Sequence, residues 1–169
     1  MNYWLLKSEP SSYSIDDLAK APRQTTAWEG IRNFQARNYL RDSVQKGDRA
    51  LFYHSSCAVP GVAGIVTIVR AGYPDGSAFD PDSEYHDGQS SRGNPVWYAV
   101  DVRLDEQFST PITLETLRQH STRELKDLLI LRRGNRLSVT PVTNNEWDFI
   151  LSLRSRSKRV RWSAKSVKK

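Results

Sequence analysis

Short apolar segments separated by polar turns run through most of the chain and predict a series of strands. Residues 3–7 are aromatic and apolar and stop before Glu9-Pro10, which favours a buried strand because a residue before proline is pushed out of the helical region. Four further segments have the apolar, β-branched or alternating pattern of strands: residues 49–54, 62–69, 96–104 and 136–142. We expect residues 62–69 at the centre of the sheet and a turn at Pro141.

Helices are predicted by their capping signals. Polar residues that favour the N-cap stand ahead of apolar positions at Ser14, Thr113, Ser121 and Thr143. The last two form Ser/Thr-x-x-Glu capping boxes with Glu124 and Glu146. Residues 33–41 have helical spacing as well. About five strands and four or five short helices in mixed order predict an α+β domain around a curled sheet, not a repeated βαβ array.

Residues 73–95 are rich in Asp, Gly, Ser and Pro and predict a long loop. The segment 80–88 gathers carboxylates and one imidazole, which raises a metal-site hypothesis. It does not fit a calcium loop, because glycine is not at the sixth position and Ser91 replaces the acidic twelfth ligand. We therefore predict a solvated loop, with no bound metal and no cofactor.

Composition limits the class of protein. The 169 residues are 38% hydrophobic and 26% charged, which fits one globular domain with a real core. Cys57 is the single cysteine, so no disulfide within the chain is possible and a reducing compartment is expected. The N-terminus lacks the pattern of a secretory signal, and no apolar run approaches the roughly 20 residues of a membrane helix. We expect a cytoplasmic protein, or a nuclear one in a eukaryote, that is monomeric and not bound to membranes.

The net charge of +6 is unevenly distributed. Residues 1–153 carry 17 cations and 19 carboxylates, a net charge of −2, whereas residues 154–169 carry eight cations and no carboxylate. We therefore predict a folded domain over 1–153 and a disordered basic tail over 154–169. The tail either aids solubility or holds phosphates without sequence preference through Arg154, Arg156, Lys158, Arg159 and Arg161.

Three histidines, His54, His86 and His120, are the candidate bases for nucleophilic catalysis. His54 precedes Ser55, which supplies a base and a nucleophile in one segment. Neighbouring residues on a strand point to opposite faces, so adjacency argues against their direct pairing. A small hydrolase or nuclease that uses His54 remains an alternative, and the competing interpretation is that His54 packs inside the sheet.

The segment Trp28-Glu29-Gly30-Ile31-Arg32-Asn33 is more suggestive. Its tryptophan stands in a turn-like, polar setting just before a helix. An indole face beside Arg32 and Asn33 is suited to holding a planar heterocycle by stacking and hydrogen bonding. An equally good interpretation is that Trp28 closes the end of the core and Arg32 pairs with a carboxylate.

The chain resembles the EVE family through a run of motifs in order. The motifs are residues 3–10 (YWLLKSEP), 28–38 (WEGIRNFQARN), 47–48 leading to 52–55 (FYHS), 73–75 (YPD), 79–81 (FDP), 136–142 (RLSVTPV) and 146–147 (EW). Together they span most of residues 1–153. The resemblance implies a PUA-like fold, a small curled mixed sheet or open barrel with short helices packed around it, related to the YTH nucleic-acid readers.

The resemblance also implies a non-enzymatic module that binds DNA or RNA and reads a modified base, such as methylated or oxidised cytosine or methyladenine. An extruded base loses a few kcal/mol of stacking, which an aromatic wall can offset in large part. The implied pocket elements are Lys7, Ser8, Glu9 and Trp28, and we add Arg32, Asn33, Tyr53, His54 and Ser55 as candidates for its rim and floor. The remaining alternative is a protein-interaction module that docks through the tail and the 73–95 loop.

Overall fold

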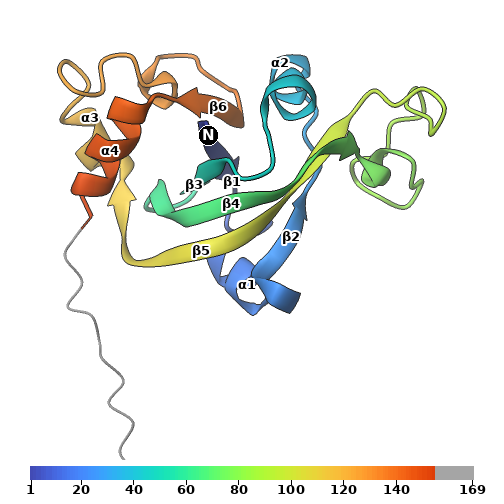
Figure 1. The fold of residues 1–169 in the computed structure, drawn as a ribbon, viewed down its shortest axis with the longest axis horizontal. Helices are drawn as coiled ribbons and strands as arrows, with labels where there is room; N and C mark the ends of the chain where they lie inside the picture. The colour runs from blue at the N-terminus through green and yellow to red at the C-terminus, as the bar shows by residue number, and fades with distance from the viewer. Residues whose placement is uncertain (155–169) are drawn as a thin grey trace, which may run out of the picture.

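The computed structural model describes residues 1–154, which form one curled sheet with short helices around it (Figure 1). The strands are β1 (Tyr3–Ser8), β2 (Thr25–Trp28), β3 (Arg49–His54), β4 (Gly61–Pro74), β5 (Tyr98–Thr113) and β6 (Val139–Val142). Their order is β2-β5-β4-β3-β1-β6, and the two end strands do not pair, so the sheet is open. The predicted α+β class and curled mixed sheet are confirmed, and the sheet does not close into a barrel.

Helices fill the connections. They are α1 (Ile15–Lys20), η1 (Pro22–Gln24), α2 (Phe34–Asn38), the π-helical η2 (Tyr39–Ser43), η3 (Gly76–Ala78), α3 (Leu114–Arg118), η4 (Leu129–Leu131) and α4 (Asn144–Ser152). The predicted caps at Ser14, Thr113 and Thr143 each accept a hydrogen bond from a backbone N–H in the first turn. In the part of the chain that the structure describes, no helix has the length and apolar character to cross a membrane.

Alternating residues of the strands supply two separate apolar cores. On β3, Phe52 belongs to a core that includes Trp4 and Trp28, whereas Tyr53 belongs to a core that includes Leu5 and Trp147. This is the period-two alternation of a sheet that is covered on both faces. The first of these cores lies behind the candidate site.

The β1–β3 pair fixes one end of the sheet. The two strands are parallel, with Tyr3 opposite Arg49 and Ser8 opposite His54. Their C-terminal ends therefore lie side by side at the same end of the sheet. On the other side β1 pairs antiparallel with β6, where Leu6 faces Val139. The residues that leave β1 and those that enter β6 therefore meet at one place.

Three sequence predictions need correction. Trp28 ends strand β2 and is not in a turn, because Thr25–Trp28 pairs antiparallel with β5. No helix starts at Ser121, since its amide N–H donates to the Arg118 carbonyl and the segment continues as successive turns. Pro141 lies inside β6, which as an edge strand tolerates the missing N–H.

Candidate functional site

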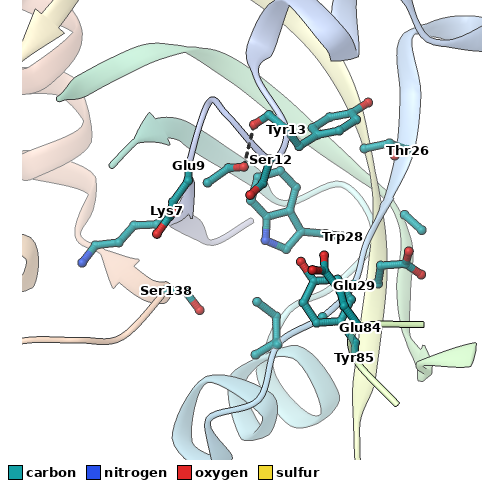
Figure 2. Close-up of a pocket in the computed structure, with 14 residues that line it drawn as sticks. Lys7, Glu9, Ser12, Tyr13, Thr26, Trp28, Glu29, Glu84, Tyr85 and Ser138 are labelled. Atoms are coloured by element: carbon teal, nitrogen blue, oxygen red, sulfur yellow. Dashed lines mark hydrogen bonds between the residues drawn. The ribbon is translucent and has the colours of Figure 1, made fainter. Parts of the chain in front are cut away.

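A half-open pocket of about 650 Å³ lies where β1, β2 and the loop after β4 come together (Figure 2). It is lined by Lys7, Ser8, Glu9, Ser12, Tyr13, Thr26, Ala27, Trp28, Glu29, Gly30, Ile31, Glu84, Tyr85 and Ser138. Figure 2 shows Lys7, Glu9 and Ser138 on one side of Trp28, and Glu29, Glu84 and Tyr85 on the other. The volume lies within the range of pockets that hold small ligands.

Trp28 forms the wall that the core supports. Its side chain is 6% exposed, and its ring meets Phe52 edge-on at 5.2 Å between centroids. Among the described residues none accepts a hydrogen bond from the indole N–H, in contrast to Trp4 and Trp97, whose N–H groups donate to carboxylates. The two interpretations of Trp28 from the sequence are thus compatible, because one residue packs in the core and lines the pocket.

Tyr85 forms a second aromatic wall, which comes from the loop between β4 and β5. Its ring lies against Gly30, where a Cβ atom would come within 2.7 Å of it. Gly30 has φ +78°, a left-handed conformation that favours glycine. Two reasons therefore favour glycine at position 30: the left-handed backbone after β2, and the contact with the Tyr85 ring, which leaves no space for a Cβ atom.

A buried polar cluster holds the Tyr85 loop in place. Asp75 is fully buried and accepts hydrogen bonds from the Gly30 amide and the Arg32 guanidinium, each at 2.9 Å. Arg32 also donates to the Tyr85 carbonyl at 2.6 Å. Burial disfavours ionised Asp75, but hydrogen bonds from Ser77, Gly30 and Arg32 outweigh it and lower the pKa of Asp75. The cluster joins the residues after β2 to the base of the loop.

The pocket lining is rich in carboxylates. Glu9, Glu29 and Glu84 line it together with one cation, Lys7. Burial, followed by the nearby charge of Asp75, raises the pKa of Glu29. Burial lowers the pKa of Lys7. The lining thus offers several acceptors and one strong donor, which suits a ligand with amino and carbonyl groups.

Four of the residues predicted from the sequence line this pocket: Lys7, Ser8, Glu9 and Trp28. Ser8 Oγ donates to the Tyr13 carbonyl at 2.6 Å, which folds the corner after β1 back on itself. Arg32 and Asn33 do not line it. Arg32 lies in the Asp75 cluster behind Tyr85, and Asn33 caps α2 by accepting from the Ala36 amide at 3.0 Å.

The three candidates at the end of β3 also lie outside the pocket lining. Tyr53 is in the opposite core, and burial raises its pKa to about 12. His54 Nε2 accepts from the Ile15 amide at 3.1 Å, which occupies the lone pair that a general base needs. Burial lowers the pKa of His54. The Ser55 amide donates to the Ser8 carbonyl at 3.0 Å, so this residue supports the β1 corner through its backbone.

Arg154 is the one predicted tail residue that the structure describes. It donates to Glu106 at 2.6 Å and to the Leu151 carbonyl at 3.1 Å. The other phosphate-binding candidates, Arg156, Lys158, Arg159 and Arg161, lie outside the described residues. Within residues 1–154, no group of three or more His, Cys, Asp or Glu side chains is arranged to hold a metal ion.

Sequence reasoning missed Tyr85, Glu29, Glu84, Tyr13 and Ser138 as lining residues. Glu29 belongs to the Trp28 segment described above, and Glu84 and Tyr85 belong to the loop predicted over residues 73–95. No local signal shows that Tyr85 folds onto Gly30, because that contact depends on the Arg32 and Asp75 side chains.

A comparison with protein families gives a match to the EVE domain over residues 2–153. The chain belongs to the EVE family. Thymocyte nuclear protein 1 of Gallus gallus is 43% identical over 166 residues, which cover 89% of this chain and 68% of that protein.

Two solved structures resemble this chain over at least 90% of its length. A Pseudomonas syringae protein is 46% identical with a TM-score of 0.85 and covers 90% of this chain and 99% of its own. Human THYN1, crystallised in complex with DNA containing 5-methylcytosine, is 38% identical with a TM-score of 0.87, and the match covers 93% of this chain and 99% of that one. The fold of this chain is therefore the fold of these solved relatives.

Proposed function

We propose that this EVE domain is a non-enzymatic reader that holds a modified base of DNA or RNA in the Trp28–Tyr85 pocket. The observation that carries the proposal is a half-open pocket with two aromatic walls, of which the Trp28 indole N–H has no acceptor among residues 1–154. Base–aromatic stacking contributes about 1–3 kcal/mol per base, enough to offset much of the cost of extruding a base from a duplex. The human relative solved with 5-methylcytosine DNA supports the same class of ligand.

The polar lining favours bases that carry an exocyclic amino group. Glu9, Glu29 and Glu84 can accept from such an amino group, and Lys7 can donate to a ring nitrogen or carbonyl. Cytosine and adenine present an amino group on the edge that pairs in a duplex, whereas thymine and uracil present carbonyl oxygens there. We therefore expect modified cytosine or adenine to bind better than modified thymine or uracil.

The test is a titration of matched oligonucleotides with 5-methylcytosine, its oxidised forms or N6-methyladenine against unmodified controls. We expect tighter binding to at least one modified oligonucleotide, and Trp28→Phe to weaken that binding while it keeps an aromatic ring in the core. A substitution outside the pocket, Lys46→Gln, serves as the matched control. Equal affinity of the unaltered chain for every oligonucleotide would contradict the proposal.

As a binding protein, the chain is expected to show no turnover of nucleotide or ester substrates, with or without divalent metal. Turnover that His54→Ala abolishes would instead favour the hydrolase or nuclease hypothesis. The monomeric state, the absence of membrane binding, the cytoplasmic or nuclear location and the phosphate-binding role of the tail stay predictions.

A further inference from the structure

Positive charge in the folded body is concentrated in one stretch of the chain. Residues 118–136 carry six cations and two carboxylates, whereas the rest of residues 1–153 has a net charge of −6. The cations are Arg118, Arg123, Lys126, Arg132, Arg133 and Arg136. The pocket itself is lined by three carboxylates and one lysine, so the charges that could attract a polyanion lie outside it.

The end of this stretch lies at the pocket. The chain enters β6 beside the residues that leave β1, and the Lys7 amide donates to the Ser138 carbonyl at 2.9 Å. Ser138 lines the pocket, and Arg136 precedes it by two residues. Two residues of extended chain span about 7 Å at most, so the Arg136 backbone lies next to the pocket wall.

The segment Arg132–Arg133–Gly134–Asn135–Arg136, called here the basic loop, has a defined shape. Asn135 donates to the Leu129 carbonyl at 2.6 Å and accepts from the Leu137 amide at 2.9 Å. The next side chain, Leu137, packs against the core that includes Trp28. The loop is thus anchored on both sides, while its three arginines are exposed.

These arginines have little competition from carboxylates. Arg132 is 4.0 Å from Asp127, and both side chains are more than half exposed, so this ion pair is weak. Within the described residues, Arg133 and Arg136 have no carboxylate at ion-pair distance. By contrast, Arg32, Arg41, Arg49 and Arg154 are each paired with a carboxylate.

We propose that the basic loop binds the sugar–phosphate backbone beside the nucleotide whose base occupies the pocket. This inference rests on the proposed function. Phosphates are repelled by the carboxylate-lined pocket, and the planar guanidinium groups of the loop match phosphate oxygens in two-point contacts. Affinity and base choice are then supplied by different residues of the same face: the loop binds every sequence, and the pocket selects the base.

The test measures affinity for a modified duplex and its unmodified control across a range of salt concentrations, with the tail intact in every variant. Each phosphate contact contributes about 0.9 to the log–log salt slope, or about a 3.5-fold change in affinity between about 50 and about 200 mM salt. We expect the double variant Arg133→Gln/Arg136→Gln to reduce the salt slope by about 0.9 to about 1.8, the equivalent of one to two phosphate contacts. It should weaken the binding of both duplexes equally, so that the ratio of their affinities is unchanged.

Lys46→Gln is the control, because this exposed cation precedes β3 at the end of the sheet opposite the pocket. The Lys46→Gln variant should have the same salt slope as the unaltered chain. An unaltered slope in the double variant would overturn the inference. A changed affinity ratio with an unaltered slope would also overturn it and would assign the arginines to base recognition. If the unaltered chain fails to discriminate between the duplexes while the slope still falls, the pocket reader fails and the phosphate site stands.

Discussion

The two aromatic walls of the pocket are built in different ways. Trp28 belongs to a strand, is almost fully buried and packs against Phe52, so the hydrophobic core fixes its position. Tyr85 is half-buried and belongs to a loop, and its position depends on the polar contacts of Arg32 and Asp75. Substitution of Trp28 should therefore lower the stability of the fold, whereas substitution of Tyr85 should leave it nearly unchanged. Four substitutions test this contrast, given in order of decreasing effect on stability.

Trp28→Ala is expected to lower the free energy of unfolding by about 3–5 kcal/mol, because it removes a large buried ring and leaves a cavity. Urea denaturation measures the loss. Trp28→Phe, which fills much of the same space, should cost far less. A loss below about 1 kcal/mol for the alanine variant would mean that the core does not support this wall.

Asp75→Asn is expected to lower the free energy of unfolding by about 3 kcal/mol at neutral pH, since Arg32 loses its buried partner. The pKa of Asp75 is lowered in the folded state, so its ionisation stabilises the protein above the ordinary carboxyl pKa of about 4, and this contribution is lost as the pH falls through the lowered pKa. The difference between wild type and variant should therefore shrink in acid.

Urea denaturation at neutral and acidic pH checks this expectation. The exposed Asp82, in the same loop, gives the matched control Asp82→Asn. A stability difference that stays constant with pH would exclude the proposed role of the Asp75 carboxylate.

Gly30→Ala is expected to cost about 1–2 kcal/mol for its left-handed backbone and to push the Tyr85 ring out of place. Gly47→Ala is the control, because Gly47 also has a left-handed φ, +93°, but nothing lies within 4 Å of its added Cβ. Both variants should lose similar stability, whereas the Gly30 variant should also lose affinity for the modified oligonucleotide. Equal binding by the two would show that the Gly30–Tyr85 contact does not shape the site.

Tyr85→Ala is expected to change the free energy of unfolding by less than about 1 kcal/mol, because the ring is outside both cores. Affinity for the modified oligonucleotide should fall by about 5-fold to about 150-fold, the equivalent of 1–3 kcal/mol of stacking. Fluorescence anisotropy checks the affinity, and Tyr85→Phe should retain it. Unchanged binding by the alanine variant would leave Trp28 as the sole stacking wall.

The features that the sequence predicts well are those with a local cause. The caps at Ser14 and Thr143 need atoms a few residues away, and strands such as Arg49–His54 show their burial in their own pattern. Strand β2 was missed because its pairing partner in β5 is more than 70 residues away. The false helix at Ser121 has a capping-box sequence, but Glu124 lies near His120 and not at the Ser121 amide.

The candidate site divides in the same way. The corner Lys7–Ser8–Glu9 and Trp28 were found from motifs and line the pocket. Arg32 was expected at the rim as a ligand contact, and it lies instead in the cluster that positions Tyr85. Which of two polar residues faces a ligand and which supports the wall behind it depends on contacts across some 50 residues, and local sequence does not encode them.

The base of the β4–β5 connection is closed by the Asp75 amide, which donates to the Trp97 carbonyl at 2.9 Å (Figure 1). The residues between Asp75 and Trp97 therefore form a long loop that connects the two paired strands β4 and β5. Doubling the length of a flexible loop costs only about 0.6 kcal/mol in closure entropy. A change in the length of the exposed parts of this connection should therefore cost little free energy of closure, whereas the buried Ala78 and Ser90 tie the segment to the body of the domain.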